Sequence, residues 1–457
     1  MRWLKRYRLR SYLRGSAWPV PTAAIPVALA VSPLIRAIDQ RTQWRLLDYS
    51  SAEAVGLLGA ITPAALTMVV LILSMLLLAV QLAASQYSPR LIGGQLARRP
   101  VKICLFILVF SYVYCAGVLG RTSGRVPQLS ILVAIVSTLV SVAAGLFLID
   151  YLAKELRPVR MLARVAEVGR VVIEQVYPRF APASGLDPGL QAGNPPPLQD
   201  PVEVIARTGR SGVLLAIDLE GLAEQARRAG CAIEVVPQVG DFVARGDPLF
   251  RVQPRLNGGV RARSLSASLA FGNERTYEQD PAFVFRVLVD VACKALSPAI
   301  NDPTTAVLAI DQIHHLLRQV GIRFLDTGEL HDPDGTLRLL YRTPDWEDFV
   351  LLAVTEIRHY GSSSIQVARR LRAMLENLIR MVPPPRAAVL REQLRLLQRS
   401  VVRSFAEAED QECAGRGDYQ GVGSSRDDDD DDADANASPV KPPTQHAPSP
   451  SYWTKVQ

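Results

Sequence analysis

Length, composition and charge place this chain among proteins with an apolar, membrane-type region followed by a soluble one. It has 457 residues, a formal net charge of +7, a hydrophobic content of 49% and a mean hydropathy of +0.13. The apolar excess lies before residue 153, and the length allows about two or three domains. Much of the positive charge flanks apolar segments, and no basic helix with interleaved aromatic residues occurs, so we expect no nucleic-acid partner.

Four uncharged stretches predict membrane spans and make the lipid bilayer the first expected partner. They occupy residues 18–34, 54–87, 103–120 and 127–148, and a span needs about 20 mostly apolar residues. The first stretch is the weakest because it contains three prolines. A basic segment followed by this stretch and by Ala28-Leu29-Ala30 also resembles a cleavable signal peptide. Cleavage would leave three spans without changing the side of the C-terminus.

The distribution of Lys and Arg predicts the orientation in a bacterial inner membrane. The larger basic sets lie before the first span, between the second and third spans, and after the fourth. Because Lys and Arg accumulate on the cytoplasmic side, both termini are expected in the cytoplasm. The bias toward Arg over Lys is typical of GC-rich bacterial genomes.

The predicted spans contain no Asp, Glu, Lys, Arg or His, which argues against a proton-coupled carrier. Hydroxyl and small residues remain, and they favour close helix packing; the alternative is a polar seam that lines an oligomeric pore. These residues are Thr62, Thr67, Ser74, Ser137, Thr138, Ser141 and Gly145.

The patterning divides the chain into seven segments and predicts a membrane α-helical domain of four spans followed by a cytoplasmic α+β region. We expect a basic cytoplasmic N-terminus at 1–16, a four-helix transmembrane domain at 17–153, a juxtamembrane helix at 154–178, a Pro/Gly linker at 179–201, a small β-rich subdomain at 202–256, a mainly helical subdomain at 257–412 and a disordered acidic and Pro-rich tail at 413–457. The juxtamembrane helix could lie at the membrane interface or pack on the soluble region.

The β-rich subdomain contains the phrase GDFVARGDPLFRV, which predicts a hairpin of the barrel-sandwich kind. Gly240 and Gly246 permit the backbone conformations that such turns need. The hairpin holds no Lys that could carry a biotinyl or lipoyl group, so we expect no such cofactor. A second turn, at 328–335, is predicted between two strand-like runs, and its aspartates do not complete a calcium loop.

Two helices in the next subdomain begin with the same Asp-Pro pair, at Asp280 and Asp302. Asp is a favourable N-cap and Pro suits the first helical position. If the two helix starts lie near one turn, they could bind a small anion through N–H groups and hydroxyls, with Arg275 or Lys294 balancing its charge. A hard cation bound by side-chain oxygens is the other option, and simple helix capping is the alternative to both. The candidate ligand-binding residues are Arg275, Thr276, Gln279, Asp280, Lys294, Ser297, Asn301, Asp302, Thr304 and Thr305.

No catalytic or metal-binding motif is found in the sequence. GxSxG, HExxH, P-loop and dinucleotide-binding patterns do not occur. His314 and His315 are adjacent on a predicted helix and point about 100° apart, so they cannot chelate one ion from one face. The five scattered cysteines predict no disulfide framework and no zinc site. We therefore expect no enzymatic activity, no metal and no cofactor.

Several phrases together resemble one family, the predicted membrane proteins of domain of unknown function 2254. They are SQYSPRLI, GDFVARGDPLFRV, FGNERTYEQDPAFVFRVLVDVACKALSPAINDPTTAV and IRHYGSSSIQVARRL. The resemblance runs from about residue 15 to 410 and implies the four-span layout, without an activity. Our leading hypothesis is a homo-oligomeric channel-like or sensory protein whose cytoplasmic domain binds a small ion. The alternative is a membrane-tethered scaffold that docks a protein partner.

Overall fold

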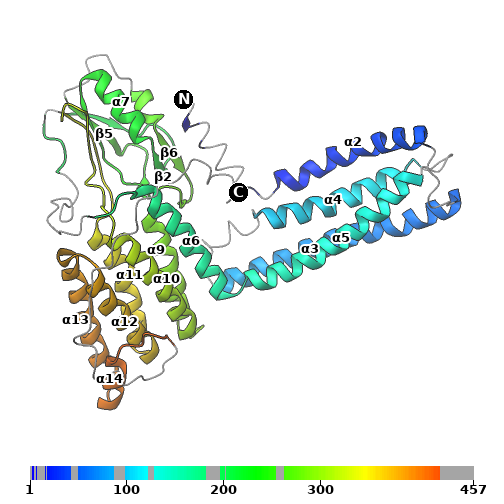
Figure 1. The fold of residues 1–457 in the computed structure, drawn as a ribbon. Helices are drawn as coiled ribbons and strands as arrows, with labels where there is room; N and C mark the ends of the chain where they lie inside the picture. The colour runs from blue at the N-terminus through cyan, green and yellow to red at the C-terminus, as the bar shows by residue number, and fades with distance from the viewer. Residues whose placement is uncertain are drawn as a thin grey trace.

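Four long apolar helices form one end of the molecule, and a larger region of helices and sheets forms the other (Figure 1). The computed structural model describes residues 3–4, 7, 16, 18–42, 50–86, 98–121, 128–181, 196–200, 202–253 and 262–421. The apolar helices are α2 (Pro19–Thr42), α3 (Ser51–Gln86), α4 (Arg99–Leu119) and α5 (Gln128–Glu155). Each is long and apolar enough to cross a membrane, as the sequence predicted.

Apolar side chains fill the interior of this four-helix bundle. One cluster includes Leu58, Tyr114 and Ile131, and a second includes Leu108 and Leu148. Helix α4 is the most buried of the four, whereas α2 and α3 are the least buried and expose many apolar side chains. The exposed side chains suit contact with lipid, because lipid tails are as apolar as the side chains themselves.

The hydroxyl groups of α4 and α5 lie mainly between these two helices. Ser111 Oγ is 3.4 Å from both Ser137 Oγ and Thr138 Oγ1, and Ser141 Oγ donates a hydrogen bond to the carbonyl of Ile107 at 3.3 Å. Thr67 on α3 instead bonds within its own helix, to the carbonyl of Pro63. This arrangement supports the packing interpretation of the small polar residues.

Two separate β-sheets form the β-rich part of the extramembrane region, by which we mean the described residues from 158 onward. The larger sheet has five strands in the order β1 (Glu203–Ala206), β5 (Pro248–Gln253), β3 (Ala232–Val235), β8 (Leu337–Tyr341) and β7 (Glu329–His331). The smaller one has three, in the order β4 (Phe242–Val243), β2 (Gly212–Ile217) and β6 (Leu269–Gly272). Helix α7 (Leu219–Ala229) follows β2 and ends at Gly230, whose φ is 64°.

The barrel-sandwich expectation was wrong in its closure. The predicted hairpin does not form either, because β4 pairs with β2 whereas β5 pairs with β1 and β3 in the other sheet. Gly240 and Gly246 do occupy turns, with φ values of 98° and 99°, which glycine tolerates. The two sheets do not close into one barrel, because β3 pairs in parallel with β8, with Ile233 opposite Leu339. The β7–β8 hairpin, expected within the helical subdomain, therefore forms the edge of the five-stranded sheet.

The helical part of the extramembrane region is built around α9 (Pro281–Ala295) and α10 (Pro303–Gly321). Helices α11 (Trp346–Gly361), α12 (Ile365–Met381) and α13 (Ala387–Ser404) follow them in the chain. The remaining helices are α6 (Pro158–Val176), α8 (Ala262–Ser266), η3 (Pro384–Arg386) and α14 (Ala408–Gly415). One large apolar cluster joins the longer helices of this part, and it includes Phe285, Leu316 and Phe349.

Some expected features lie outside the described residues. The run of aspartates at 427–432 and most of the 179–201 linker belong there, as does most of the SQYSPRLI phrase. The first part of the expected tail is described, and it packs on the protein: Asp418 N donates a hydrogen bond to the carbonyl of Arg369, and Gln366 donates one to the carbonyl of Gly421.

Candidate functional site

Both Asp-Pro pairs begin helices, as the sequence predicted. Asp280 Oδ1 accepts a hydrogen bond from Phe283 N at 2.9 Å, and Asp302 Oδ1 accepts one from Thr305 N at 3.0 Å. A proline follows each Asp at the first helical position. The side chains thus satisfy N–H groups that have no partner within their helices.

The two helix starts lie at opposite ends of α9. Asp302 N donates a hydrogen bond at 2.8 Å to the carbonyl of Ala295, the last residue of α9, whereas Asp280 precedes its first residue. A helix of 15 residues is about 22 Å long. The two carboxylates therefore cannot contact one small ion, and the ten candidate residues form two groups.

The group at the α9–α10 turn is satisfied largely by local hydrogen bonds. Asp302 Oδ2 accepts a bond from Thr305 Oγ1 at 2.5 Å, and Ser297 Oγ donates to the carbonyl of Lys294 at 2.7 Å. Asn301 has a left-handed φ of 47°, which Asn tolerates better than most residues and which turns the chain into α10. Thr304 is exposed. These contacts fit helix capping, because both oxygens of Asp302 already have partners.

The group at the start of α9 joins the smaller sheet to the helices. Gln279 Oε1 accepts a hydrogen bond from Ile217 N at 2.9 Å, and Gln279 Nε2 donates one to the carbonyl of Ile217 at 3.3 Å. Arg275 Nε lies 3.1 Å from Asp280 Oδ2, and its guanidinium lies against Gly240, where any Cβ would overlap it. This group therefore fastens β2 and the turn at Gly240 to α9.

Burial dominates the electrostatics of Asp280. It raises the pKa of that carboxyl, and the Arg275 guanidinium acts in the opposite direction. Arg275 Nε and Asp280 Oδ2 are buried and face each other as an ion pair at 3.1 Å, without the geometry of a hydrogen bond, and Thr276 Oγ1 is buried without a hydrogen-bond partner. Across the described part of the chain, His, Cys, Asp and Glu form no group of three that could hold a metal ion.

A third constellation, which the sequence did not reveal, lies where α5 leaves the bundle. The Glu155 carboxylate accepts hydrogen bonds from Arg98, which directly precedes α4, and from Arg164 in the first turns of α6. The side chain of Glu155 is 6% exposed and that of Arg98 is 15% exposed. One buried carboxylate thus connects the start of α4, the end of α5 and the beginning of α6.

Helix α6 packs against the helices of the extramembrane region, which is one of the two expected arrangements. Its apolar face contributes Leu162, Val165 and Ile173 to the cluster that contains α9 and α10, and Ala83 of α3 joins the same cluster. Gly169 allows the closest approach, because a Cβ there would lie 2.6 Å from Val284 Cγ1 and 3.1 Å from Leu316 Cδ1. Two residues, Leu156 and Arg157, separate α5 from α6, and Pro158 starts the new helix.

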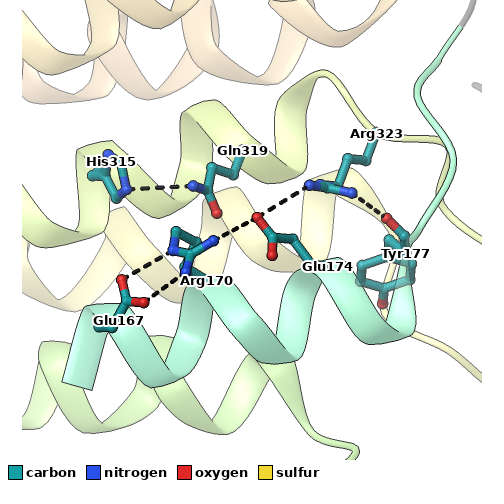
Figure 2. A network of polar contacts seen from close by, with 7 residues as sticks. All are labelled: Glu167, Arg170, Glu174, Tyr177, His315, Gln319 and Arg323. Atoms are coloured by element: carbon teal, nitrogen blue, oxygen red, sulfur yellow. Dashed lines mark hydrogen bonds and ion pairs between the residues drawn. The ribbon is translucent and has the colours of Figure 1, made fainter. Parts of the chain in front are cut away.

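A ladder of charged groups holds the far end of α6 to the residues that follow α10 (Figure 2). Arg170 pairs with Glu167 at 2.6 Å and with Glu174 at 2.7 Å, and Glu174 lies 3.8 Å from Arg323. Arg323 also donates a hydrogen bond to the carbonyl of Tyr177 at 2.7 Å. The Arg323 side chain is buried, which lowers its pKa, so these two partners offset much of the cost of its burial.

Tyr177 completes the anchoring of α6. Its ring is buried edge-on against Phe349 of α11, and its hydroxyl lies 3.4 Å from the hydroxyl of Thr343. Burial raises the pKa of this phenol. We name Glu155, Arg98, Arg164, Arg323 and Tyr177 the junction residues, because they fasten α6 at both ends. Two acidic residues, Asp150 and Glu155, follow the uncharged run of the fourth span, and the sequence alone does not show that Glu155 is the buried one.

Comparisons with known proteins identify relatives along most of the chain. The model of the family described as predicted membrane protein DUF2254 matches residues 14–377. An uncharacterized protein of Mycobacterium bovis is 27% identical over 424 residues, which cover 89% of this chain and 80% of that protein. An uncharacterized protein of Mycobacterium tuberculosis matches with the same identity and coverage. No solved structure matches the chain. With four apolar helices in place and a family match over most of its length, this chain belongs to the DUF2254 family of predicted membrane proteins.

Proposed function

We propose that this protein is a non-enzymatic, oligomeric sensory or channel-like protein of the bacterial inner membrane. In this proposal, its extramembrane region lies in the cytoplasm and moves together with the fourth span. The observation that carries the proposal is the path from α5 through Glu155 into α6, whose apolar face is part of the core of the extramembrane region. A tether that served only as an anchor would not need to share a core with the region that it holds.

The junction residues make α6 a stiff connector. A packed helix transmits displacement because close-packed interiors have low compressibility. Gly169 lets α6 approach α9 and α10 closely, and Arg323 holds its C-terminal end. A tilt or rotation of α5 would therefore change the position of α9 and α10, and a ligand-driven change in those helices would act back on α5.

Two observations support the cytoplasmic orientation. The basic residues are concentrated before α2, between α3 and α4, and after α5, which favours these segments on the cytoplasmic side. Trp3, Leu4 and Tyr7 pack against the smaller sheet beside Leu215 and Ala270. The N-terminal segment and the extramembrane region thus share one side, which agrees with an even number of spans.

A channel-like role would require several copies of the chain. The interior of a single bundle is filled by side chains such as Tyr114, Leu108 and Leu148. The exposed apolar faces of α3 and α5, which include Leu78 and Leu139, are surfaces where further copies could pack. A pore would then lie between chains, on an axis of the oligomer.

The proposal is tested with the full chain reconstituted in liposomes and nanodiscs. Ion and small-solute flux is measured under voltage and membrane tension for the wild type, for Glu155→Gln and for Asp150→Asn. Asp150 is the matched control, since it lies on the same helix with its side chain 59% exposed and pairs only locally with Lys154. In parallel, the distance between spin labels placed at exposed positions Leu139 and Val402 is measured by pulsed electron paramagnetic resonance in bilayers of different thickness.

We expect either flux, or a label distance that changes with bilayer thickness, in the wild type and in Asp150→Asn. Glu155→Gln should reduce that response, because it removes the charge that joins α4, α5 and α6. If no flux is measured and the distance between the two spin labels is the same in every bilayer, both the channel hypothesis and the sensory hypothesis are wrong. A stoichiometric protein partner recovered by cross-linking under those conditions would favour the scaffold.

A further inference from the structure

A cavity of about 390 Å³ lies between the loop that joins β1 to β2 and the strand β6. Leu249, Leu269 and Phe271 form its apolar wall, and Thr208, Ser211 and Asn273 supply polar groups at its edge. Its volume lies within the range of about 300–1,000 Å³ that small-molecule sites occupy. None of the sequence-predicted site residues contributes to it.

Arg207 places a buried positive charge in the wall of this cavity. The residue is 9% exposed, and its guanidinium carbon lies 3.5 Å from the centre of the Phe271 ring. Its Nε donates a hydrogen bond at 2.8 Å to the carbonyl of Arg210, and Nη2 donates to the same oxygen. Within the part of the chain that the structure describes, no carboxylate forms an ion pair with this guanidinium. A buried cation of this kind ordinarily has an anionic partner.

Arg207 and Arg210 are the charged residues among the described lining, and both are positive. Arg210 is exposed on the loop at the mouth of the cavity, and the described lining residues include no Asp and no Glu. Gly212 lets the loop lie close to β6, because a Cβ at that position would be 2.9 Å from the carbonyl oxygen of Gly272. The cavity is therefore lined by two arginines together with hydroxyl and amide side chains, and Arg207 has its guanidinium buried in the wall.

We propose that this cavity binds the phosphate group of a small anionic ligand. Guanidinium groups match the geometry of phosphate oxygens, and hydrogen bonds between charged partners are stronger than neutral ones. Arg207 would contact the phosphate from the wall, Arg210 from the mouth, and the Thr208 and Ser211 hydroxyls would donate further hydrogen bonds. The apolar wall suits the less polar remainder of the ligand. The idea that ligand binding at this site regulates the protein rests on the proposed function. Phosphate binding itself can be tested whether or not the protein is a sensor.

The phosphate group could belong to a soluble molecule or to a lipid headgroup, and the experiment separates the two. The full-length protein in phosphate-free detergent is titrated with inorganic phosphate and with a nucleoside monophosphate, at constant ionic strength maintained with chloride. The readouts are the melting temperature and the line width of the ³¹P magnetic resonance signal of the ligand. A second arm compares melting temperatures in nanodiscs of phosphatidylcholine with and without phosphatidic acid.

Two variants and one matched control accompany these titrations. Arg210→Glu reverses the charge at the mouth, and because Arg210 is exposed the protein should fold normally. Arg207→Lys keeps the buried charge but loses the planar guanidinium. Arg391→Glu is the control, since Arg391 is exposed on α13, does not line the cavity and undergoes the same change of charge.

We expect a saturable rise in melting temperature with at least one phosphate compound, since a ligand that binds only the folded state stabilises it. Arg210→Glu should weaken binding roughly tenfold or more, because it removes a charged hydrogen-bond donor, whereas Arg391→Glu should stay within about twofold of the wild type. A response in detergent assigns the site to a soluble ligand, and a response confined to phosphatidic acid nanodiscs assigns it to a lipid. No saturable response in either arm, or equal weakening by Arg210→Glu and Arg391→Glu, would overturn the proposal.

Discussion

Glu155, at the end of the fourth span, accepts a hydrogen bond from Arg98, which directly precedes the third span. The same carboxylate accepts one from Arg164 of α6. One buried carboxylate therefore links the start of α4, the end of α5 and helix α6, which leads into the extramembrane region. Removing its charge leaves Arg98 buried without its partner, which makes this contact a sensitive point for mutation.

Glu155→Gln should lower the free energy of unfolding in detergent by about 1–3 kcal/mol, the usual cost of leaving a buried polar group without its partner. Unfolding by denaturant, followed by circular dichroism, measures the change. Asp150→Asn should stay within about 0.5 kcal/mol of the wild type, since exposed ion pairs contribute little. Equal effects of the two variants would show that the buried position of Glu155 has no special importance.

Gly169→Val should destabilise the extramembrane region by about 1–3 kcal/mol, as overpacking of a filled core does. The added side chain would overlap Val284 and Leu316, which lie against Gly169. Gly56→Val is the matched control, because no atom lies within 4 Å of a Cβ built there. Thermal unfolding of both variants gives the comparison, and a Gly169 variant as stable as the control would contradict the close packing of α6.

The stability of the protein should fall when the pH drops below about 6.5, the ordinary pKa of histidine, and His314 should account for part of this. Burial lowers the pKa of His314, and the nearby Arg370 and Arg318 act in the same direction, while Asn377 and Asp311 oppose them. Below that pH the unfolded chain takes up a proton at this position that the folded protein does not, so folding becomes less favourable.

The free energy of unfolding of the wild type and of His314→Gln at pH 7.5 and 5.5 checks this prediction. The variant should lose less stability between the two pH values than the wild type. His315→Gln serves as the control, because His315 is exposed on the same helix, and it should retain the wild-type dependence. A variant at position 314 with the full wild-type dependence would exclude this histidine as the cause.

Asp302→Ala should cost about 1 kcal/mol, the typical effect of losing an N-cap, and Asp302→Ser should recover most of it because serine also caps helices well. This pair of variants separates capping from ion binding at the α9–α10 turn. If the turn only caps the helix, neither calcium nor phosphate changes the difference in melting temperature between the wild type and Asp302→Ser. Stabilisation of the wild type alone by one of these ions would restore the ligand-binding hypothesis.

Local patterns in the sequence were sufficient for features that depend on neighbouring residues. The apolar runs predicted the four long helices, Asp280 and Asp302 predicted two helix starts, and Gly240 and Gly246 predicted turn positions with positive φ. Each of these follows from a few consecutive side chains, through hydropathy, capping or a positive φ. The same locality explains why strands β1, β2, β3 and β5 lie within the segment 202–256 that was expected to be rich in strands.

What the sequence determined by itself was therefore the four spans, the starts of α9 and α10, the turns at Gly240 and Gly246, and the family to which the chain belongs. The tertiary structure decided which of them meet. It placed Asp280 and Asp302 at opposite ends of α9, and it joined β3 to β8 in place of a closed barrel. It also brought Arg98 to Glu155, and Arg207 to the wall of a cavity. These contacts connect residues far apart in the chain, or depend on how whole elements pack, and no local pattern encodes such pairings.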